Sequence, residues 1–167
     1  MYATGIAFAA TRVMAGIKNN HATELIKIRR VGLLNGQTAG VTGVACSLEY
    51  RKDTNPTFTP ATTTTTIASH DSTNTAPASY VYGHTGTYTP AAALTLRRTI
   101  WSSDEAAVSS ATSDELECFV PLNILFDAGY GDANVQPLTL RQNDFAGLYN
   151  ISGAAGLLDS WTEFTKE

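Results

Sequence analysis

This chain of 167 residues has few charged side chains and no long apolar run. Only 16% of its residues are Asp, Glu, Lys or Arg, whereas about a quarter is usual in a soluble domain. The net charge of −4 argues against nucleic acid as a partner, because phosphate binding needs clustered Lys and Arg. No segment approaches the roughly 20 apolar residues that a membrane-spanning helix needs, so we expect no membrane partner.

The common motifs of catalysis are also missing. The sequence contains no Gly-x-Ser-x-Gly elbow, no phosphate-binding glycine-rich loop and no Cys-x-x-Cys pair. Its histidines, His21, His70 and His84, lie far apart and lack the spacing of metal ligands. His70 and Asp71 stand in a polar stretch that is typical of a turn, where side chains bond to local backbone. We therefore predict no catalytic residue, metal or cofactor, and no enzyme.

Acidic and amide side chains surround two glycines near residue 130, a composition that could bind calcium. They are Asp127, Asp132 and Asn134, with Gly129 and Gly131. An EF-hand loop needs acidic ligands at its first, third and fifth positions and a glutamate at the twelfth, and this spacing does not supply them. We interpret the segment as a turn, with calcium binding as the alternative.

Aromatic side chains with a polar tip could stack on sugars or form contacts with other proteins. The candidates are Tyr80, Tyr82, Tyr88, Trp101, Tyr130, Tyr149 and Trp161. We expect most of them in the core or in interfaces, with a carbohydrate platform as the alternative. The position of Trp161 is ambiguous, because Leu158 and Phe164 have the opposite phase in its strand.

Alternation of apolar and polar residues predicts antiparallel strands. In residues 43–51, the side chains of Val44, Cys46, Leu48 and Tyr50 point one way and their neighbours the other. Cys46 should therefore be a small buried side chain, and nothing indicates the secretion that a disulfide with Cys118 would require.

Further strands are expected along the rest of the chain. The apolar phase of residues 24–34 slips near Arg29 and Arg30, which predicts a bulge. We expect these two arginines, and the doublet Arg97 and Arg98, to lie in strands and to pair with carboxylates. The other predicted strands are residues 78–82, 93–101, 116–120, 135–140, 147–151 and 157–164, the last held in a sheet almost to the C-terminus.

The remaining segments predict loops and few helices. No segment shows a sustained 3.6-residue period, so we expect at most short helical turns, one of them after the capping-box pattern at residues 102–105. Residues 52–66, rich in Thr, should form a loop that leads into an exposed strand, and residues 123–134 a long loop. The whole pattern predicts an all-β fold, an antiparallel β-sandwich that is jelly-roll-like. Residues 1–20 would form an N-terminal strand or arm, and residues 21–167 a single sandwich domain.

Several short segments, taken in order, carry a resemblance to a known group of proteins. They are Glu24-Leu-Ile-Lys-Ile-Arg-Arg-Val31, Ser47-Leu-Glu-Tyr-Arg51, His70-Asp71, Leu96-Arg-Arg98, Trp101-Ser102, Gln136-Pro-Leu-Thr-Leu-Arg141 and Trp161-Thr-Glu-Phe164. These segments resemble small virion proteins of tailed phages, the capsid decoration or cement type. The similarity loosens at residues 142–148, where such proteins often read Gly-Glu-Gly-Leu.

The resemblance implies a β-sandwich that sits on the assembled capsid, commonly as a homotrimer at a three-fold position, without catalytic residues. We therefore expect a structural virion protein, a cement or decoration subunit that binds the major capsid protein at the capsid surface and is assembled in the host cytoplasm. The small-residue segment 1–17 could reach a neighbouring subunit. The alternative function is a jelly-roll carbohydrate-binding module of a phage tail or fibre.

Overall fold

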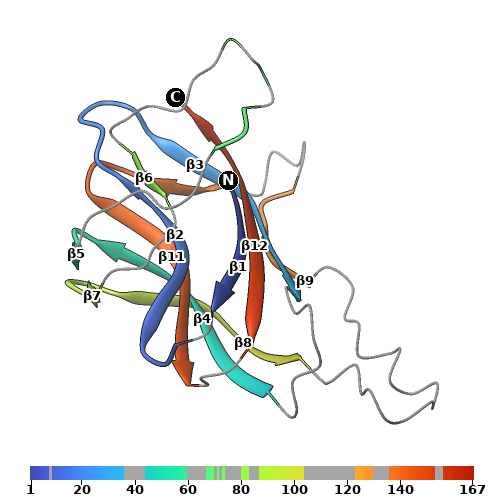
Figure 1. The fold of residues 1–167 in the computed structure, drawn as a ribbon. Helices are drawn as coiled ribbons and strands as arrows, with labels where there is room; N and C mark the ends of the chain where they lie inside the picture. Colours follow the sequence, from blue (N-terminus) through green and yellow to red (C-terminus); the bar gives the residue numbers. More distant parts are fainter. Residues whose placement is uncertain are drawn as a thin grey trace.

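The structure, a computed structural model, describes residues 1–7, 9–35, 44–59, 67–69, 71, 73, 80–82, 87–103, 123–129, 136–152 and 156–167. It is an all-β fold in which antiparallel sheets pack against each other as a β-sandwich, as the sequence predicts (Figure 1). In this described part, no helix is long and apolar enough to cross a membrane.

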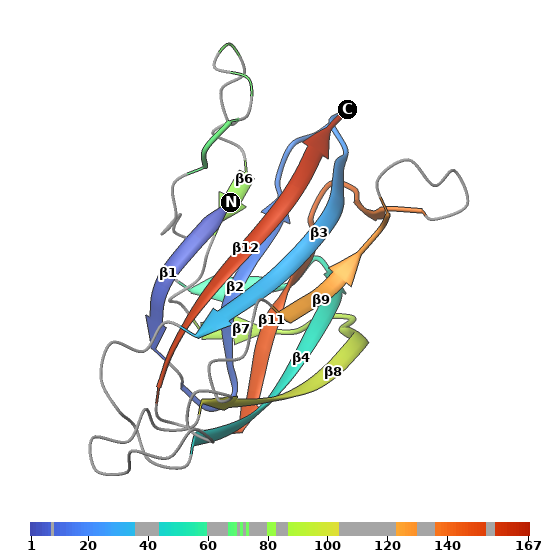
Figure 2. The ribbon, with the colours of Figure 1, turned by 90° about the vertical axis from the view of Figure 1, so that its right-hand side faces the viewer.

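Sheet A forms one layer of the sandwich, and Figure 2 shows its strands side by side. Its strand order is β1-β12-β3-β10, and β9 also pairs with β3. The bounds are β1 (Tyr2–Ala7), β12 (Leu157–Lys166), β3 (Ile26–Asn35), β10 (Leu138–Leu140) and β9 (Asn123–Asp127). Because β9 pairs with residues 30–33 of β3 and β10 with residues 26–28, the two short strands follow one another along β3.

Sheet B forms the other layer, in the order β6-β2-β11-β4-β8. The bounds are β6 (Tyr80–Tyr82), β2 (Arg12–Asn19), β11 (Asp144–Ser152), β4 (Val44–Thr54) and β8 (Leu94–Ser103). A third, two-stranded sheet C pairs β5 (Thr57–Thr59) with β7 (Thr87–Thr89). The jelly-roll-like strand order stays a prediction.

The core lies between sheets A and B and is made of side chains that are at most 6% exposed. It contains Met14, Ile17, Ile26, Ile28, Val31, Leu33, Cys46, Leu48, Tyr50, Leu125, Leu140, Ala146, Leu148 and Leu158. The alternation predicted for residues 43–51 is confirmed, because Cys46, Leu48 and Tyr50 all face this core. Burial of a large apolar side chain of this kind contributes about 1.5–3 kcal/mol. The same burial raises the pKa of the free Cys46 thiol.

The predicted slip in β3 is confirmed by the register of its pairing with β12. Glu163 pairs with Arg30 and Phe164 with Ile28, so Arg29 is the extra residue of a bulge. The bulge allows Ile28 and Val31, which have opposite phases, both to reach the core.

The C-terminal strand is held inside its sheet, as predicted. β12 pairs with β3 over residues 158–166 and with β1 over residues 157–161. At its end, the amide of Leu25 donates to the carbonyl of Glu167 (2.8 Å), and the amide of Glu167 donates to the carbonyl of Leu25 (3.0 Å). The first residues belong to the same body of the fold, since β1 pairs with β12 and β2 with β11.

Two predicted loops contain strands. Residues 123–127 form β9, because Leu125 packs in the core and Phe126 stacks on Tyr50, with ring centroids 6.3 Å apart. Residues 52–54 complete β4 and residues 57–59 form β5, which the buried ring of Phe58 anchors. Residues 60–66, the predicted strand at 116–120 and the predicted helical turn after residue 103 lie outside the described residues.

A second apolar cluster lies on the outer face of sheet B, where sheet C contacts it. Val13, Phe58 and Phe145 are buried there, and the rings of Tyr88 and Tyr149 pack against them. The ring of Phe145 occupies the space over a pair of glycines that face each other, Gly16 on β2 and Gly147 on β11. A Cβ atom added to either glycine would approach the Phe145 ring to 2.4 Å, so this position of the ring requires both glycines.

We predict that Gly16→Ala lowers the free energy of unfolding by about 1–3 kcal/mol, because the new methyl group overpacks this site. In a Phe145→Leu background the penalty should be smaller, since part of the clash is with the ring. Urea unfolding of the four proteins of this double-mutant cycle measures the coupling. Additive effects of the two substitutions would contradict this packing.

Candidate functional site

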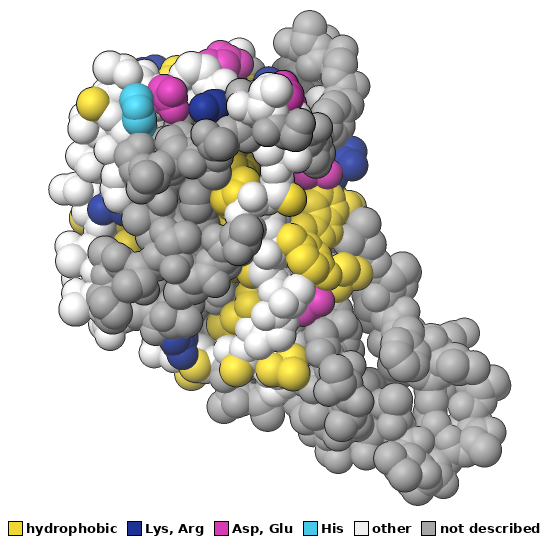
Figure 3. Space-filling view, turned by 45° about the horizontal axis from the view of Figure 1, so that its top comes forward, with side chains coloured by type: hydrophobic (Ala, Val, Ile, Leu, Met, Phe, Trp, Pro, Cys, Tyr) yellow, Lys and Arg dark blue, Asp and Glu magenta, His cyan; other side chains and the backbone are white. Residues whose placement is uncertain are grey.

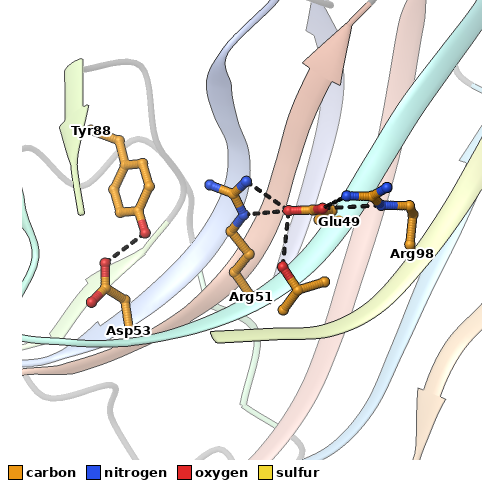
Figure 4. A network of polar contacts seen from close by, with 6 residues as sticks. Glu49, Arg51, Asp53, Tyr88 and Arg98 are labelled. Carbon is orange, nitrogen blue, oxygen red and sulfur yellow. Dashed lines mark hydrogen bonds and ion pairs between the residues drawn. The ribbon is translucent and has the colours of Figure 1, made fainter. Parts of the chain in front are cut away.

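The outward side of β4 carries a row of charged residues, Glu49, Arg51 and Asp53, at alternate positions (Figure 4). A polar outward face of a strand is expected to be solvated. Here Glu49 is only 3% exposed and Asp53 is 0% exposed. Neighbouring parts of the chain cover both carboxylates, and the hydrogen-bond donors come from these parts and from Arg51 of β4 itself.

The carboxylate of Glu49 binds two guanidinium groups and a hydroxyl. Arg51 donates from Nε at 2.6 Å, and Thr95 donates from Oγ1 at 3.0 Å. Arg98 donates from Nε at 3.0 Å and also from Nη2. The register explains the last contact, because Arg98 of β8 lies directly opposite Glu49 of β4. Two positive charges therefore share one negative charge at this edge of sheet B.

The environment of Glu49 favours its ionised form. Burial opposes ionisation and is the largest single effect, but the hydrogen bonds from Arg98, Arg51 and Thr95 together outweigh it, so the pKa of Glu49 is lowered. Glu49 therefore stays charged at neutral pH and holds both arginines in place.

Arg51 is fixed from a second side by an aromatic ring. Its Cζ atom lies 3.6 Å from the centroid of the Tyr149 ring, a cation–π contact. Tyr149 belongs to β11 and lies opposite Glu49 in the register, so the contact between Arg51 and Tyr149 runs diagonally across two strands. The Tyr149 ring in turn packs on Tyr88, with centroids 5.8 Å apart.

Asp53 fastens sheet C and the segment after β7 to sheet B. Its carboxylate accepts a hydrogen bond from the Tyr88 hydroxyl at 2.6 Å (Figure 4) and from the amides of Ala91 at 3.2 Å and Ala92 at 2.7 Å. Burial, followed by the hydrogen bond to Asp53, raises the pKa of Tyr88, so this hydroxyl remains a donor. A continuous series of contacts therefore runs from sheet C to the β8 edge. It passes from Asp53 through the rings of Tyr88 and Tyr149 to Arg51, and from Arg51 through Glu49 to Arg98.

The candidates for metal or turn roles are separate in space, and those described bind locally. The Nδ1 atom of His21 accepts from the amide of Glu24 at 3.0 Å. Asp71 accepts from the amide of Thr73 at 2.9 Å, as expected of a turn, and Asp127 accepts from the amide of Gly129 at 2.8 Å. His70, His84, Cys118, Asp132 and Asn134 lie outside the described residues. Among the described residues, no group of three or more His, Cys, Asp or Glu could hold a metal ion.

The predicted pairing with a carboxylate is confirmed for Arg30 and Arg98, whereas the described aromatic candidates lie on two different sheets. Arg98 pairs with Glu49, and Arg30 pairs with Asp127 at 3.1 Å. Tyr88 and Tyr149 belong to the outer cluster of sheet B, whereas Trp161 lies on sheet A. Tyr130 and the side chains of Tyr80, Tyr82 and Trp101 lie outside the described set. Glu49 and Asp53 were not predicted as site residues from the sequence. The opposite charges of Glu49 and Arg51, two residues apart on a clear strand, could have indicated this pair.

Comparison with known proteins identifies no relative of this chain. No protein-family model matches the chain, and no curated protein or solved structure matches it either.

We predict that Glu49→Gln lowers the free energy of unfolding at pH 7 by about 1.5–3 kcal/mol, the range for hydrogen bonds to charged groups. Arg98→Ala should change it by less than about 1 kcal/mol, because the Arg98 side chain is 66% exposed and water replaces the lost contact. Urea denaturation of both variants measures the difference. Equal losses would contradict a network centred on Glu49.

The lowered pKa of Glu49 also predicts a dependence of stability on pH. Its contribution is fully present above the pKa of an unfolded glutamate, about 4.3, and is lost as the pH falls through the lower folded value. The wild type should therefore lose more stability than Glu49→Gln between pH 6 and pH 3. Denaturation curves for the two proteins that fall in parallel would show that Glu49 does not contribute to this loss.

Proposed function

We propose that this chain is a structural virion protein, a capsid cement or decoration subunit that binds the major capsid protein on the assembled phage head. The observation that carries the proposal is the exposed edge of sheet B. β8 pairs with β4 on one side, and no strand in the described part of the chain pairs with its other side. Two apolar side chains of this strand are largely exposed, Leu94 at 61% and Ile100 at 74%.

A ten-residue edge strand with exposed apolar side chains suits contact with another protein. Its N–H and C=O groups on the side away from β4, which no described strand pairs with, can bind a strand of a second chain, and its side chains supply specificity. Monomeric proteins usually protect such an edge, since it invites association. The exposed edge therefore supports a function in binding other protein subunits.

The charges beside this edge favour an acidic partner strand. Glu49 neutralises only one of its two arginines, and Arg98 is held in position while 66% of its side chain stays exposed. A carboxylate from the partner could bind Arg98 at little cost in side-chain entropy, because Arg98 is already fixed. We therefore assign the contact with the major capsid protein to the β8 edge, with Arg98 and Ile100 at its centre.

The proposed role, stabilisation of the assembled capsid, follows from mass action. A protein that binds only the assembled lattice stabilises that lattice by an amount that grows with its concentration and affinity. A homotrimer at a three-fold position would present three β8 edges at once, so weak individual contacts would add to a strong attachment. The subunit would act at the surface of the virion, after capsid assembly in the host cytoplasm.

We predict that Ile100→Lys weakens binding to empty heads of the cognate capsid protein by about tenfold or more, because burial of such a side chain is worth about 1.5–3 kcal/mol. Co-sedimentation of the purified protein with the heads measures this. The matched control is Ile124→Lys, the same change at an exposed isoleucine of sheet A. It should leave head binding intact.

The possible results distinguish the proposed function, binding to the phage head, from the proposed position of the contact on the β8 edge. Failure of the unsubstituted protein to bind heads, together with a strictly monomeric state in analytical ultracentrifugation, would contradict the proposed function. Loss of binding in Ile124→Lys but not in Ile100→Lys would keep the function and move the contact to sheet A.

A further inference from the structure

The outer face of sheet A carries a row of apolar side chains that is separate from the β8 edge of sheet B. Tyr2 is 48% exposed and Ile124 is 41% exposed, and the partly exposed Trp161 stands between their strands. The register aligns them, since Tyr2 pairs with Trp161, Trp161 with Gly32, and Gly32 with Ile124. Their four strands lie side by side in Figure 2, and Figure 3 shows hydrophobic side chains gathered on this side of the molecule, next to charged ones.

Gly32 makes the centre of this row flat. A Cβ atom at this position would lie 2.3 Å from Cε2 and 2.4 Å from Nε1 of Trp161. The indole therefore rests directly on the backbone of β3, in space that any other residue would fill. The ring contacts the strand at Gly32, and the Trp161 side chain as a whole stays partly exposed.

Polar groups that are already held in place border the row. The Tyr2 hydroxyl donates to Oδ2 of Asp159 at 3.1 Å, and the amide of Gly5 donates to Oδ1 of Asp159 at 2.7 Å. Both of these partners are uncharged, so neither of them forms an ion pair with the Asp159 carboxylate. On the other side, Arg30 and Asp127 form an ion pair at 3.1 Å that stays about one-third exposed. Carboxylates, a guanidinium and a phenol therefore surround a flat apolar surface.

We propose that the row formed by Tyr2, Trp161 and Ile124 is a binding site for an uncharged polysaccharide. The C–H bonds on one face of a pyranose ring form a flat, slightly electropositive surface, which fits the negative face of an indole. The hydroxyls at the edge of the sugar would donate to Asp159 and Asp127 and accept from Arg30. This site is independent of the proposed capsid contact, because it lies on the other sheet.

The dimensions and charges of the row point to a sugar chain. Neighbouring strands lie about 4.8 Å apart, so the row extends over roughly 14 Å across four strands, enough for more than one sugar unit. The rings are restrained by Gly32 and Asp159, which limits the entropy lost on binding. The charge of Asp159 disfavours polyanions. A protein contact is the competing occupant, but its dominant residues usually insert into pockets, and this surface is flat around Trp161.

Affinity electrophoresis of the purified chain tests the site, with β-glucan, galactomannan, dextran and glycogen as neutral probes and alginate as the anionic one. We expect retardation by at least one neutral polysaccharide and none by alginate. Glycan-array screening extends the neutral set if these four fail. Trp161→Ala should weaken binding by more than about tenfold, and Tyr2→Ala by a smaller factor.

Gly32→Ala is the sharpest variant, because it keeps the indole and only lifts it from the strand. It should lose polysaccharide binding while it keeps its circular dichroism spectrum, and Ile100→Lys should bind as the unsubstituted protein does. If Trp161→Ala or Gly32→Ala fails to fold, Tyr2→Ala at the sheet edge decides the question. The proposal is overturned if no neutral polysaccharide binds, if binding survives these substitutions, or if they abolish head binding instead.

Discussion

The packing of one phenylalanine ring on two glycines organises the part of the outer face of sheet B that sheet C covers. Phe145 can occupy the space over Gly16 and Gly147 only because neither has a side chain. The ring then contacts Phe58 of β5, with centroids 4.9 Å apart, and Tyr88 of β7, at 5.8 Å. Through these two contacts sheet C is held against sheet B, and the chain gains a third layer over part of the sandwich.

The charged row on β4 depends on that layer. Sheet C and the segment after β7 cover Asp53 and also bring the Tyr88 hydroxyl and the amide of Ala92 to its carboxylate, which compensates for the hydration that the carboxylate loses. Tyr149 packs against Tyr88 and supports Arg51, and Arg51 binds Glu49. Arg98 is the last member, on the β8 edge. A disturbance at the glycine pair should therefore reach the edge strand through packed rings and ion pairs.

An ion pair with a buried carboxylate adds little stability over a well-packed apolar pair, because the carboxylate loses its hydration. The contribution of this ion pair is to fix the position of a guanidinium group. Glu49 holds the guanidinium of Arg98 opposite it on β8, and the part of that group that remains exposed is aimed by contacts that do not involve a partner. A fixed cation on an open strand edge discriminates between partner strands better than a mobile one does, which is the property that ordered attachment to a lattice would require.

Local patterns predicted much of the sandwich. The alternation from Cys46 to Tyr50 and the phase slip at Arg29 are both properties of a few consecutive residues, and both were correct. Residues 123–127 were predicted as a loop because the glycines that follow hid a five-residue strand, whose pairing with β3 is a distant contact. Sequence alone also left Glu49 on the polar side of its strand and Asp53 in the Thr-rich loop. Their burial comes from β8, β7 and the segment that follows β7, more than thirty residues away along the chain.

The same reason explains why the aromatic candidates were predicted as one set and are found in two places. Tyr88 and Tyr149 complete a packed cluster on sheet B, so their rings serve stability. Trp161 meets Tyr2, which stands at the opposite end of the chain, and the two become neighbours only through the pairing of β1 with β12. When the pairing of distant strands brings the residues of a surface together, no pattern of consecutive residues in the sequence indicates that surface. The two exposed surfaces therefore belong to different sheets, and a subunit attached through the β8 edge would keep the outer face of sheet A free for a second ligand.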